Sequence, residues 1–387
     1  MLIFGEMNYN KITPPILEQL KQIVGQDFVF TEQDKLEQYG RDETENLLFM
    51  PEVVVKPSTP QQIAEILKIA NTHVIPVTPR AAGTGLSGGA LPIRGGIILS
   101  VERFNKIIDI DERNLQATVE PGVINEVFQN AVAQKGLFYP PDPASKGSCF
   151  MGGNVAENSG GPKCVKYGVT RDYILNLEVV LPTGEIIYTG ANTLKNSTGY
   201  NLTQLMVGSE GTLGIVTKII VKLIPLPKHN LLMLVPFRST EEACMAVSEI
   251  FKAGYTPSAL EFMERDALVW VSKHVQSSVV KVEDDIEAHL LIEVDGNNLE
   301  VLMQDMEAIS AVLGKFNIAD ILFAESQAQK DELWKLRRKI NEAVKATAIS
   351  KEQDTVVQRA ELPQLVKGIK EIGKRYNFRS VCYGHAG

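Results

Sequence analysis

The stretch that decides the fold is residues 79–92, Pro-Arg-Ala-Ala-Gly-Thr-Gly-Leu-Ser-Gly-Gly-Ala-Leu-Pro. It follows a strand-helix-strand unit. Residues 51–57 predict a strand closed by proline, and residues 75–79 predict a second one. Between them, Thr59-Pro60-Gln61-Gln62 is a capping box with proline at the first helical position. The amphipathic helix behind it is predicted from the spacing of Ile63, Ile66, Leu67 and Ala70.

Gly83, Gly85 and Gly88 match the pattern GxGxxG, but the context of a dinucleotide-binding turn is absent. Such a turn opens a helix whose N-terminus faces the pyrophosphate. Here Gly89-Ala-Leu-Pro92 and Gly95-Gly96 prevent a helix of normal length. Asp109 follows the glycines at about the sequence distance of a ribose-binding acid, but without such a turn a ribose-binding role for it is not supported. A Walker phosphate loop is excluded because no Gly-Lys-Ser/Thr follows.

A backbone nest explains the loop better. Its glycines allow positive φ, so that consecutive N–H groups can point into one concavity, and Thr84 and Ser87 add hydroxyl donors. Such a loop can hold a buried pyrophosphate without lysines. The alternative is a flexible surface loop, and the strand directly before it argues against that alternative.

Two more glycine-rich elements follow, one at residues 140–145 with 151–161 and one at 206–214. Small residues there let the backbone approach a flat ligand closely. Three separated elements of this kind predict one long ligand with a ring system and a diphosphate.

The remaining pattern predicts two further parts of the chain. Residues 1–45 are polar and helical, with Pro14-Pro15 opening one helix. A domain boundary is expected near residues 225–230. Before it, a strand (115–120), a helix (123–136), a hairpin (174–181 with 185–189) and a long β run (214–225) are expected; after it, strands at 231–237, 258–263, 289–295 and 318–324 alternate with helices and predict an antiparallel sheet.

Composition narrows the class of protein. A chain of 387 residues is too long for a single hydrophobic core, so two or more domains are expected. The net charge of −8, without a block of basic residues, argues against nucleic acid as a partner. Cys149, Cys164, Cys244 and Cys382 form no CxxC pair and are expected to be reduced. No apolar run is long enough for a membrane span, and the first residues do not resemble a signal peptide. A cytoplasmic protein is predicted, peripheral to a membrane only through an electron acceptor.

These elements resemble the FAD-binding domain of the vanillyl-alcohol oxidase superfamily, the p-cresol methylhydroxylase type. The matching pieces are residues 79–92, 139–145, 152–161, 166–172 and 208–216, and the resemblance covers roughly residues 45–225. It implies an α+β protein: an FAD-binding domain of two α+β subdomains over residues 46–226, followed by a substrate (cap) domain with an antiparallel sheet over 227–387. The pyrophosphate is expected on the first loop.

The resemblance assigns FAD contacts residue by residue. Because residues 79–92 contain no histidine of the kind that attaches flavin in some members, it implies non-covalent FAD. The residues assigned to the cofactor are Pro79, Arg80, Gly83, Thr84, Gly85, Leu86, Ser87, Gly88, Gly89, Pro141, Asp142, Ser148, Gly152, Gly153, Asn158, Gly160, Gly161, Tyr167, Gly168, Glu210, Gly211, Ile215 and Val216.

Arg337 lies in a helix expected to begin near Ser326. On its own, the Arg337-Arg338 pair suits a solvated helix face. In the 2-hydroxyacid dehydrogenases of this superfamily, of the glycolate oxidase and D-lactate dehydrogenase type, a Trp-x-x-Arg helix directs its arginine at the substrate carboxylate, and Trp334-Lys-Leu-Arg337 is similar. Asn341, one turn later on the expected helix, is a second candidate. Relatives specific for 2-hydroxyglutarate have a lysine just before the segment that resembles Asp354-Thr-Val-Val357. The corresponding residue here is Glu352 or, in the alternative register, the adjacent Lys351; Glu352 favours a monocarboxylate such as D-lactate or glycolate.

The last residues, Val381-Cys-Tyr-Gly-His-Ala-Gly387, resemble the opening of a Gly-His-x-Gly-Asp-Gly-Asn-x-His motif whose histidines bind a divalent metal. His385 is thereby a candidate ligand for Zn²⁺ or Mn²⁺ in a full-length protein. The resemblance also implies a chain truncated at its C-terminus, which binds FAD but turns over little.

Several partners and alternatives stay open. The expected reaction transfers a hydride from a small 2-hydroxy acid to flavin N5 and passes the electrons to a quinone, a cytochrome or an iron–sulfur partner subunit; a homodimer is also open. The alternatives are an inactive FAD-binding fragment and a flavin oxidase of another alcohol, such as a sugar lactone or phenol. Arg337 argues against the last because those substrates have no carboxylate.

Overall fold

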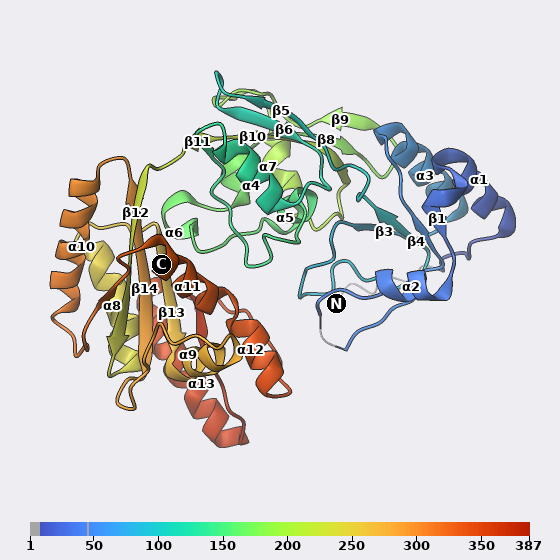
Figure 1. Ribbon diagram of the computed structural model, residues 1–387. Helices are drawn as coiled ribbons and strands as arrows, with labels where there is room; N and C mark the ends of the chain where they lie inside the picture. The colour runs from blue at the N-terminus through green and yellow to red at the C-terminus, as the bar shows by residue number, and fades with distance from the viewer. Residues whose placement is uncertain (1–7, 45) are drawn as a thin grey trace. The chain divides into compact units, whose positions relative to one another are not determined.

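The computed structural model describes residues 8–44 and 46–387, so the expectations for residues 1–7 and 45 lie outside the described residues. The described chain forms two compact units (Figure 1). The first contains the residues up to 160 together with 169–226. The second contains residues 161–168 and 227–387.

The first sheet of the first unit has the strand order β1-β2-β4-β3. β1 (Val29–Phe30) is antiparallel to β2 (Val53–Val55), whereas β4 (Ile97–Ser100) is parallel to both β2 and β3 (Val77–Arg80). Parallel neighbours usually need a crossover helix. β3 and β4 are instead joined by residues 81–96, the glycine-rich loop, which contains no helix. The rejection of a dinucleotide-binding turn is confirmed.

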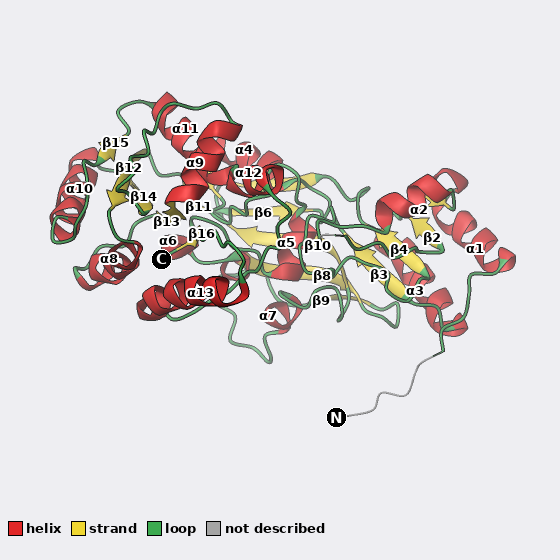
Figure 2. Cartoon of the chain, turned by 90° about the horizontal axis from the view of Figure 1, so that it is seen from below, coloured by secondary structure: helices red, strands yellow, loops and turns green. Residues whose placement is uncertain are grey.

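Helix α3 (Pro60–His73) packs on this sheet beside α1 (Pro14–Val24). Its start follows the predicted cap, since Gln62 N donates to Thr59 Oγ1 at 3.2 Å. The Gln62 side chain accepts from Ser58 N rather than from Thr59. The four predicted apolar positions of the helix are all buried, and the helix α2 (Gln33–Tyr39) completes this part (Figure 2).

The second sheet is antiparallel, in the order β5-β6-β10-β8-β9. It contains the predicted hairpin, β8 with β9, but also β5, which the pattern did not indicate. Asp109 is exposed on β5 of this sheet, whereas the loop of residues 81–96 joins two strands of the first sheet. The bounds are β5 Ile107–Asp111, β6 Gln116–Val119, β8 Ile174–Val180, β9 Ile186–Tyr188 and β10 Ile215–Lys222; beside them lie α4 Asn125–Ala133, α5 Met151–Glu157, α7 Leu202–Met206 and the short pair β7 Leu137–Phe138 with β11 Ile224–Pro225.

The second unit is built on an antiparallel sheet in the order β15-β12-β14-β13-β16. Helices cover both faces, so eight of the nine residues of β14 are buried. In Figure 1, α8 and α10 lie on one face, and α9, α11 and α12 on the other. The bounds are β12 His229–Phe237, α8 Thr240–Lys252, β13 Ala259–Glu264, α9 Arg265–His274, β14 Ala288–Gly296, α10 Leu299–Leu313, β15 Leu322–Phe323, α11 Gln327–Arg338, α12 Ile340–Thr347, α13 Leu362–Tyr376 and β16 Tyr383–His385.

Residues 161–168, which contain the short helix α6 (Cys164–Tyr167), are held to β14 by charge. Lys163 forms an ion pair with Glu293, and Lys166 Nζ lies 2.7 Å from Asp295 Oδ1. Both carboxylates are almost fully buried, so these lysines supply their counter-charge. Trp334 of α11 also donates to Glu293, at 2.8 Å.

Candidate active site

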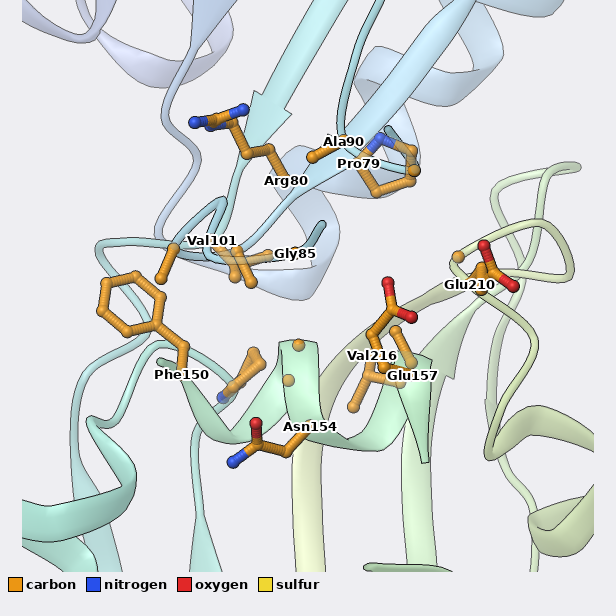
Figure 3. Close-up of a pocket in the computed structure, with 18 of the residues that line it drawn as sticks. Pro79, Arg80, Gly85, Ala90, Val101, Phe150, Asn154, Glu157, Glu210 and Val216 are labelled. Atoms are coloured by element: carbon orange, nitrogen blue, oxygen red, sulfur yellow. The ribbon is translucent and has the colours of Figure 1, made fainter. Parts of the chain in front are cut away.

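A pocket in the first unit is lined by all three glycine-rich elements (Figure 3). The end of β3 and the loop after it contribute Pro79 to Gly85, Gly89 and Ala90. Helix α5 and the residues around it contribute Phe150, Asn154 and Glu157. The segment from Met206 to Val216 closes the remaining side. Residues far apart in the sequence thus surround one cavity, as expected for a single extended ligand.

The loop offers this pocket an unusual number of free backbone donors. Among the described residues, no backbone N–H from Ala81 to Ala90 donates a hydrogen bond; the next donor is Leu91, to Gly88 O. Residues 81–85 are half-buried, so these donors are not simply solvated. Buried N–H groups are nearly always paired. A run of unpaired ones is a site for an anion such as a diphosphate.

Two kinds of glycine shape the pocket. Gly83 and Gly88 have φ of 73° and 78°, which favours glycine and turns the loop. Gly152, at the start of α5, has no room for a side chain, since a Cβ there would lie 2.5 Å from Pro121 Cβ. Gly85 and Gly89 do not have positive φ, contrary to the sequence expectation. The pocket and its donors suit a long ligand with a diphosphate.

In the second unit, two of the predicted residues, Arg337 and His385, meet at Glu261 of β13. Arg337 Nη2 lies 2.6 Å from Glu261 Oε2, and His385 Nδ1 lies 2.7 Å from Oε1. Glu261 is fully buried; burial opposes its ionisation, but the charge of Arg337 and the hydrogen bond from His385 outweigh this and lower its pKa. The Arg337 guanidinium also lies over the Tyr383 ring.

Asn341 lies apart from this group. Helix α11 ends at Arg338 and α12 begins at Ile340, so Asn341 is not one turn further on the same helix, as the sequence predicted. Its side chain donates to Glu352 Oε2 at 3.0 Å. No described contact joins Asn341 to Arg337.

Comparison with known proteins assigns the family. Residues 51–190 match the family described as FAD binding domain, and residues 226–387 match the C-terminal domain of FAD linked oxidases. The chain is 40% identical to the glycolate oxidase subunit GlcD of Bacillus subtilis, over 97% of this chain and 79% of that protein. It is 38% identical to a D-lactate dehydrogenase of Anaerostipes hadrus, over 99% of this chain and 81% of that protein.

The chain belongs to the FAD-linked oxidases.

Solved structures agree on the fold of this oxidase. An alkyldihydroxyacetonephosphate synthase matches with a TM-score of 0.77 at 19% identity, over 95% of this chain and 77% of that one. p-Cresol methylhydroxylase matches with a TM-score of 0.69 at 21% identity, over 83% and 68%. The predicted α+β class, the superfamily and FAD as cofactor are confirmed, and the protein is an FAD-dependent oxidoreductase. None of the described helices has the length and apolar character of a membrane span.

The predicted FAD residues of the oxidase divide into two groups. Pocket-lining positions are Pro79, Arg80, Gly83, Thr84, Gly85, Gly89, Gly152, Gly153, Glu210, Gly211, Ile215 and Val216. Of the others, Leu86, Ser87 and Gly88 lie in the glycine-rich loop but do not line the cavity. Pro141 and Asp142 are buried and do not line it either. Asn158 caps the C-terminus of α5, and its side chain accepts from Arg171 N; Ser148 donates to Ser145 O.

Four further predicted residues lie where the pocket does not reach. Gly160 is the last residue of the first unit before the 161–168 segment, and Gly161, Tyr167 and Gly168 belong to the second unit. The hydroxyl of Tyr167 lies 2.8 Å from Asp295 Oδ1, so this tyrosine helps to anchor the segment to β14.

The pocket also has lining residues that sequence reasoning missed. Most are small or polar neighbours of the glycines, so their position inside the quoted elements was the available signal. Val101 and Pro121 had none, because they follow strands β4 and β6. The missed residues are Ala81, Ala82, Ala90, Val101, Pro121, Ser145, Cys149, Phe150, Asn154, Ala156, Glu157, Ser159, Met206, Ser209 and Gly214.

Proposed function

We propose that this oxidase converts a small 2-hydroxy acid, of the D-lactate or glycolate type, into the corresponding 2-oxo acid. The names of its relatives support oxidation of such acids in general terms. FAD, held by the N–H groups of residues 81–90, supplies the oxidant, since flavin N5 accepts a hydride. We propose that residues of the second unit bind the acid.

The observation that carries the proposal is the state of Arg337. Its side chain is only 11% exposed, and its Nε–H is buried without an acceptor in the described part of the chain. A buried donor without a partner costs about 1–3 kcal/mol. A substrate carboxylate would supply the acceptor, while the ion pair with Glu261 and the Tyr383 ring hold the guanidinium in place.

Glu352 supports a monocarboxylate as substrate. Its carboxylate is hydrogen-bonded to Asn341, the second candidate for substrate contact. A second carboxylate on the substrate would meet this negative charge, which disfavours dicarboxylates such as 2-hydroxyglutarate.

His385 is proposed to carry its free electron pair on Nε2. Donation from Nδ1 to Glu261 fixes that tautomer, as carboxylates do for metal-binding histidines. Among the described residues, however, no three His, Cys, Asp or Glu side chains converge to hold a metal ion. His385 therefore has the orientation of one Zn²⁺ or Mn²⁺ ligand without further ligands beside it, and no step is assigned to a metal.

The electrons are proposed to leave to an external acceptor, a quinone, a cytochrome or an iron–sulfur partner subunit. All four cysteines of the chain are free, and their spacing in the sequence contains no CxxC pair for a cluster.

Anaerobic mixing with substrate tests the proposed activity. We expect D-lactate or glycolate to bleach the flavin absorbance near ~450 nm, with 2-hydroxyglutarate less effective by at least about tenfold, since one misplaced charge costs on the order of 1.4 kcal/mol or more. Bleaching by a neutral alcohol, with no response to any 2-hydroxy acid, would contradict the proposal.

The flavin is expected to be non-covalent. The pocket-lining residues of the first unit include no histidine or tyrosine. Cys149 lines it, but burial raises the pKa of its thiol, which disfavours the nucleophilic thiolate. Acid precipitation should therefore leave all yellow colour in the supernatant. Colour retained in the pellet after washing would show a covalent bond.

A further inference from the structure

Two carboxylates, Glu157 and Glu210, face the FAD pocket without a partner. Glu157 is the last residue of α5, and Glu210 lies in the loop after α7. Both residues keep exposed surface, although Glu157 is partly desolvated by its surroundings, and neither carboxylate makes a hydrogen bond or ion pair to any group of residues 8–44 or 46–387. Figure 3 shows them on the same side of the pocket.

Both carboxylates approach the glycine-rich loop. A Cβ placed on Gly89 would lie 3.4 Å from Glu210 Oε2 and 3.6 Å from Glu157 Oε1, so these oxygens are at most about 7 Å apart. A Cβ on Gly85 would lie 3.8 Å from Glu157 Oε1. These glycines belong to the loop whose free N–H groups suit a diphosphate. An ionised Glu157 would therefore place a negative charge close to an anionic ligand held by this loop.

Arg80 does not resolve this conflict. Its guanidinium lies 5.5 Å from the centre of the Tyr39 ring and donates to Tyr39 O. The charges that act on it are those of Asp42, Tyr39 and Glu102 rather than Glu157. Glu157 instead feels burial and the negative charges of Glu210 and Asp42, and all three raise its pKa even before a ligand excludes water.

We infer that Glu157 contacts the diphosphate of FAD as a neutral carboxylic acid, after taking up one proton from solvent when the cofactor binds. Its O–H then donates to a phosphate oxygen, where an ionised carboxylate would repel it. The inference concerns the cofactor site alone and is independent of the substrate proposed above.

The pH dependence follows from the sign of this change. A group whose pKa is higher in the complex favours binding at low pH. FAD affinity is then full below the pKa of Glu157 in the free protein and is lost as the pH rises toward its pKa in the complex. Between the two, Kd should rise by up to about tenfold per pH unit for one proton.

Calorimetry on the full chain stripped of flavin measures this directly. FAD is titrated at about pH 5 to 8, a range chosen above the ordinary pKa of glutamate, in two buffers of different ionisation enthalpy. The expected result is net uptake of up to one proton. ADP-ribose, whose diphosphate is esterified at both ends as in FAD and does not titrate in this range, should show the same uptake, and riboflavin, which lacks a diphosphate, should show none. Absence of uptake with both FAD and ADP-ribose would overturn the inference.

Matched variants locate the proton. Glu157→Gln keeps a donor without a charge, so it should bind FAD with a Kd independent of pH and without proton uptake. Glu65→Gln, on an exposed position of α3 outside the pocket, should behave like the unmodified protein. Uptake that persists in Glu157→Gln would overturn the assignment, as would loss of FAD from a folded Glu157→Gln protein.

Glu210→Gln gives an independent reading if Glu157→Gln does not fold. Removing the neighbouring charge should lower the pKa of Glu157 in both states, and the range over which affinity is lost should move to lower pH. An unchanged pH dependence would count against the inference.

Discussion

Arg337→Ala should lower the free energy of unfolding by about 3–5 kcal/mol and raise KM for the 2-hydroxy acid at the same time. The stability loss follows from Glu261, which is fully buried and would keep only His385 as a partner. The KM effect follows from the lost hydrogen bonds to the substrate carboxylate, which cost on the order of 2–5 kcal/mol. Denaturant unfolding and steady-state kinetics measure the two effects separately.

Arg337→Lys is the matched control, because lysine keeps a cation beside Glu261 but loses the planar fork that grips a carboxylate. Its stability should stay within about 1.5 kcal/mol of the parent protein, while KM still rises by roughly tenfold or more. If both variants change stability but leave KM as it was, Arg337 serves only to neutralise Glu261, and the proposed substrate contact is wrong.

Gly85→Asp should abolish FAD binding. The new carboxylate would lie among the free N–H groups of the loop, near Glu157 Oε1, which is 3.8 Å from the Cβ position. The introduced carboxylate and the diphosphate of FAD would repel each other. At about 4 Å near a protein surface, two such charges repel by roughly 4 kcal/mol, which corresponds to a rise in Kd of about 1,000-fold. The flavin-to-protein absorbance ratio of the purified variant is the first measurement.

Gly85→Ala separates charge from space. Gly85 does not have positive φ, and a Cβ there meets nothing closer than that 3.8 Å contact, so alanine should fit and FAD should remain. If Gly85→Asp retained FAD at full occupancy, the assignment of the diphosphate to this loop would be wrong. Loss of FAD in both variants would show that the ligand itself needs the space of the missing Cβ.

The sequence predicted those elements well whose structure depends only on residues close to them in the chain. The cap at Thr59 and the apolar stripe of α3 have their causes within a few residues, and both are observed. The prolines and glycines after Gly88 correctly excluded a helix, since they act on their own backbone. The strands β4 and β5 were missed because pairing with neighbouring strands stabilises them, and no local pattern in the sequence indicates that pairing.

The candidate site was predictable to a smaller extent. The glycine elements were visible, and they do line one pocket, because small residues are needed wherever a backbone approaches a ligand. Nothing in the sequence distinguished Glu261 as a site residue, because it lies within an otherwise apolar predicted strand. Only the packing of α11 and β16 against β13 brings Arg337 and His385 to its carboxylate. The break at Lys339, which separates Asn341 from Arg337, likewise has no proline or glycine to announce it.

The anchoring of residues 161–168 to β14 has a consequence for how this chain can be recombined with others. Glu293 and Asp295 are buried, and their cations Lys163 and Lys166 come from a segment that precedes the whole remainder of the second unit in the chain. A gene fusion that joins a foreign C-terminal half at residue 227 would keep Lys163 and Lys166 but replace Glu293 and Asp295, so the two lysines would face unmatched side chains. The eight residues must therefore be inherited together with the sheet that they neutralise, although more than fifty positions separate them from it along the chain.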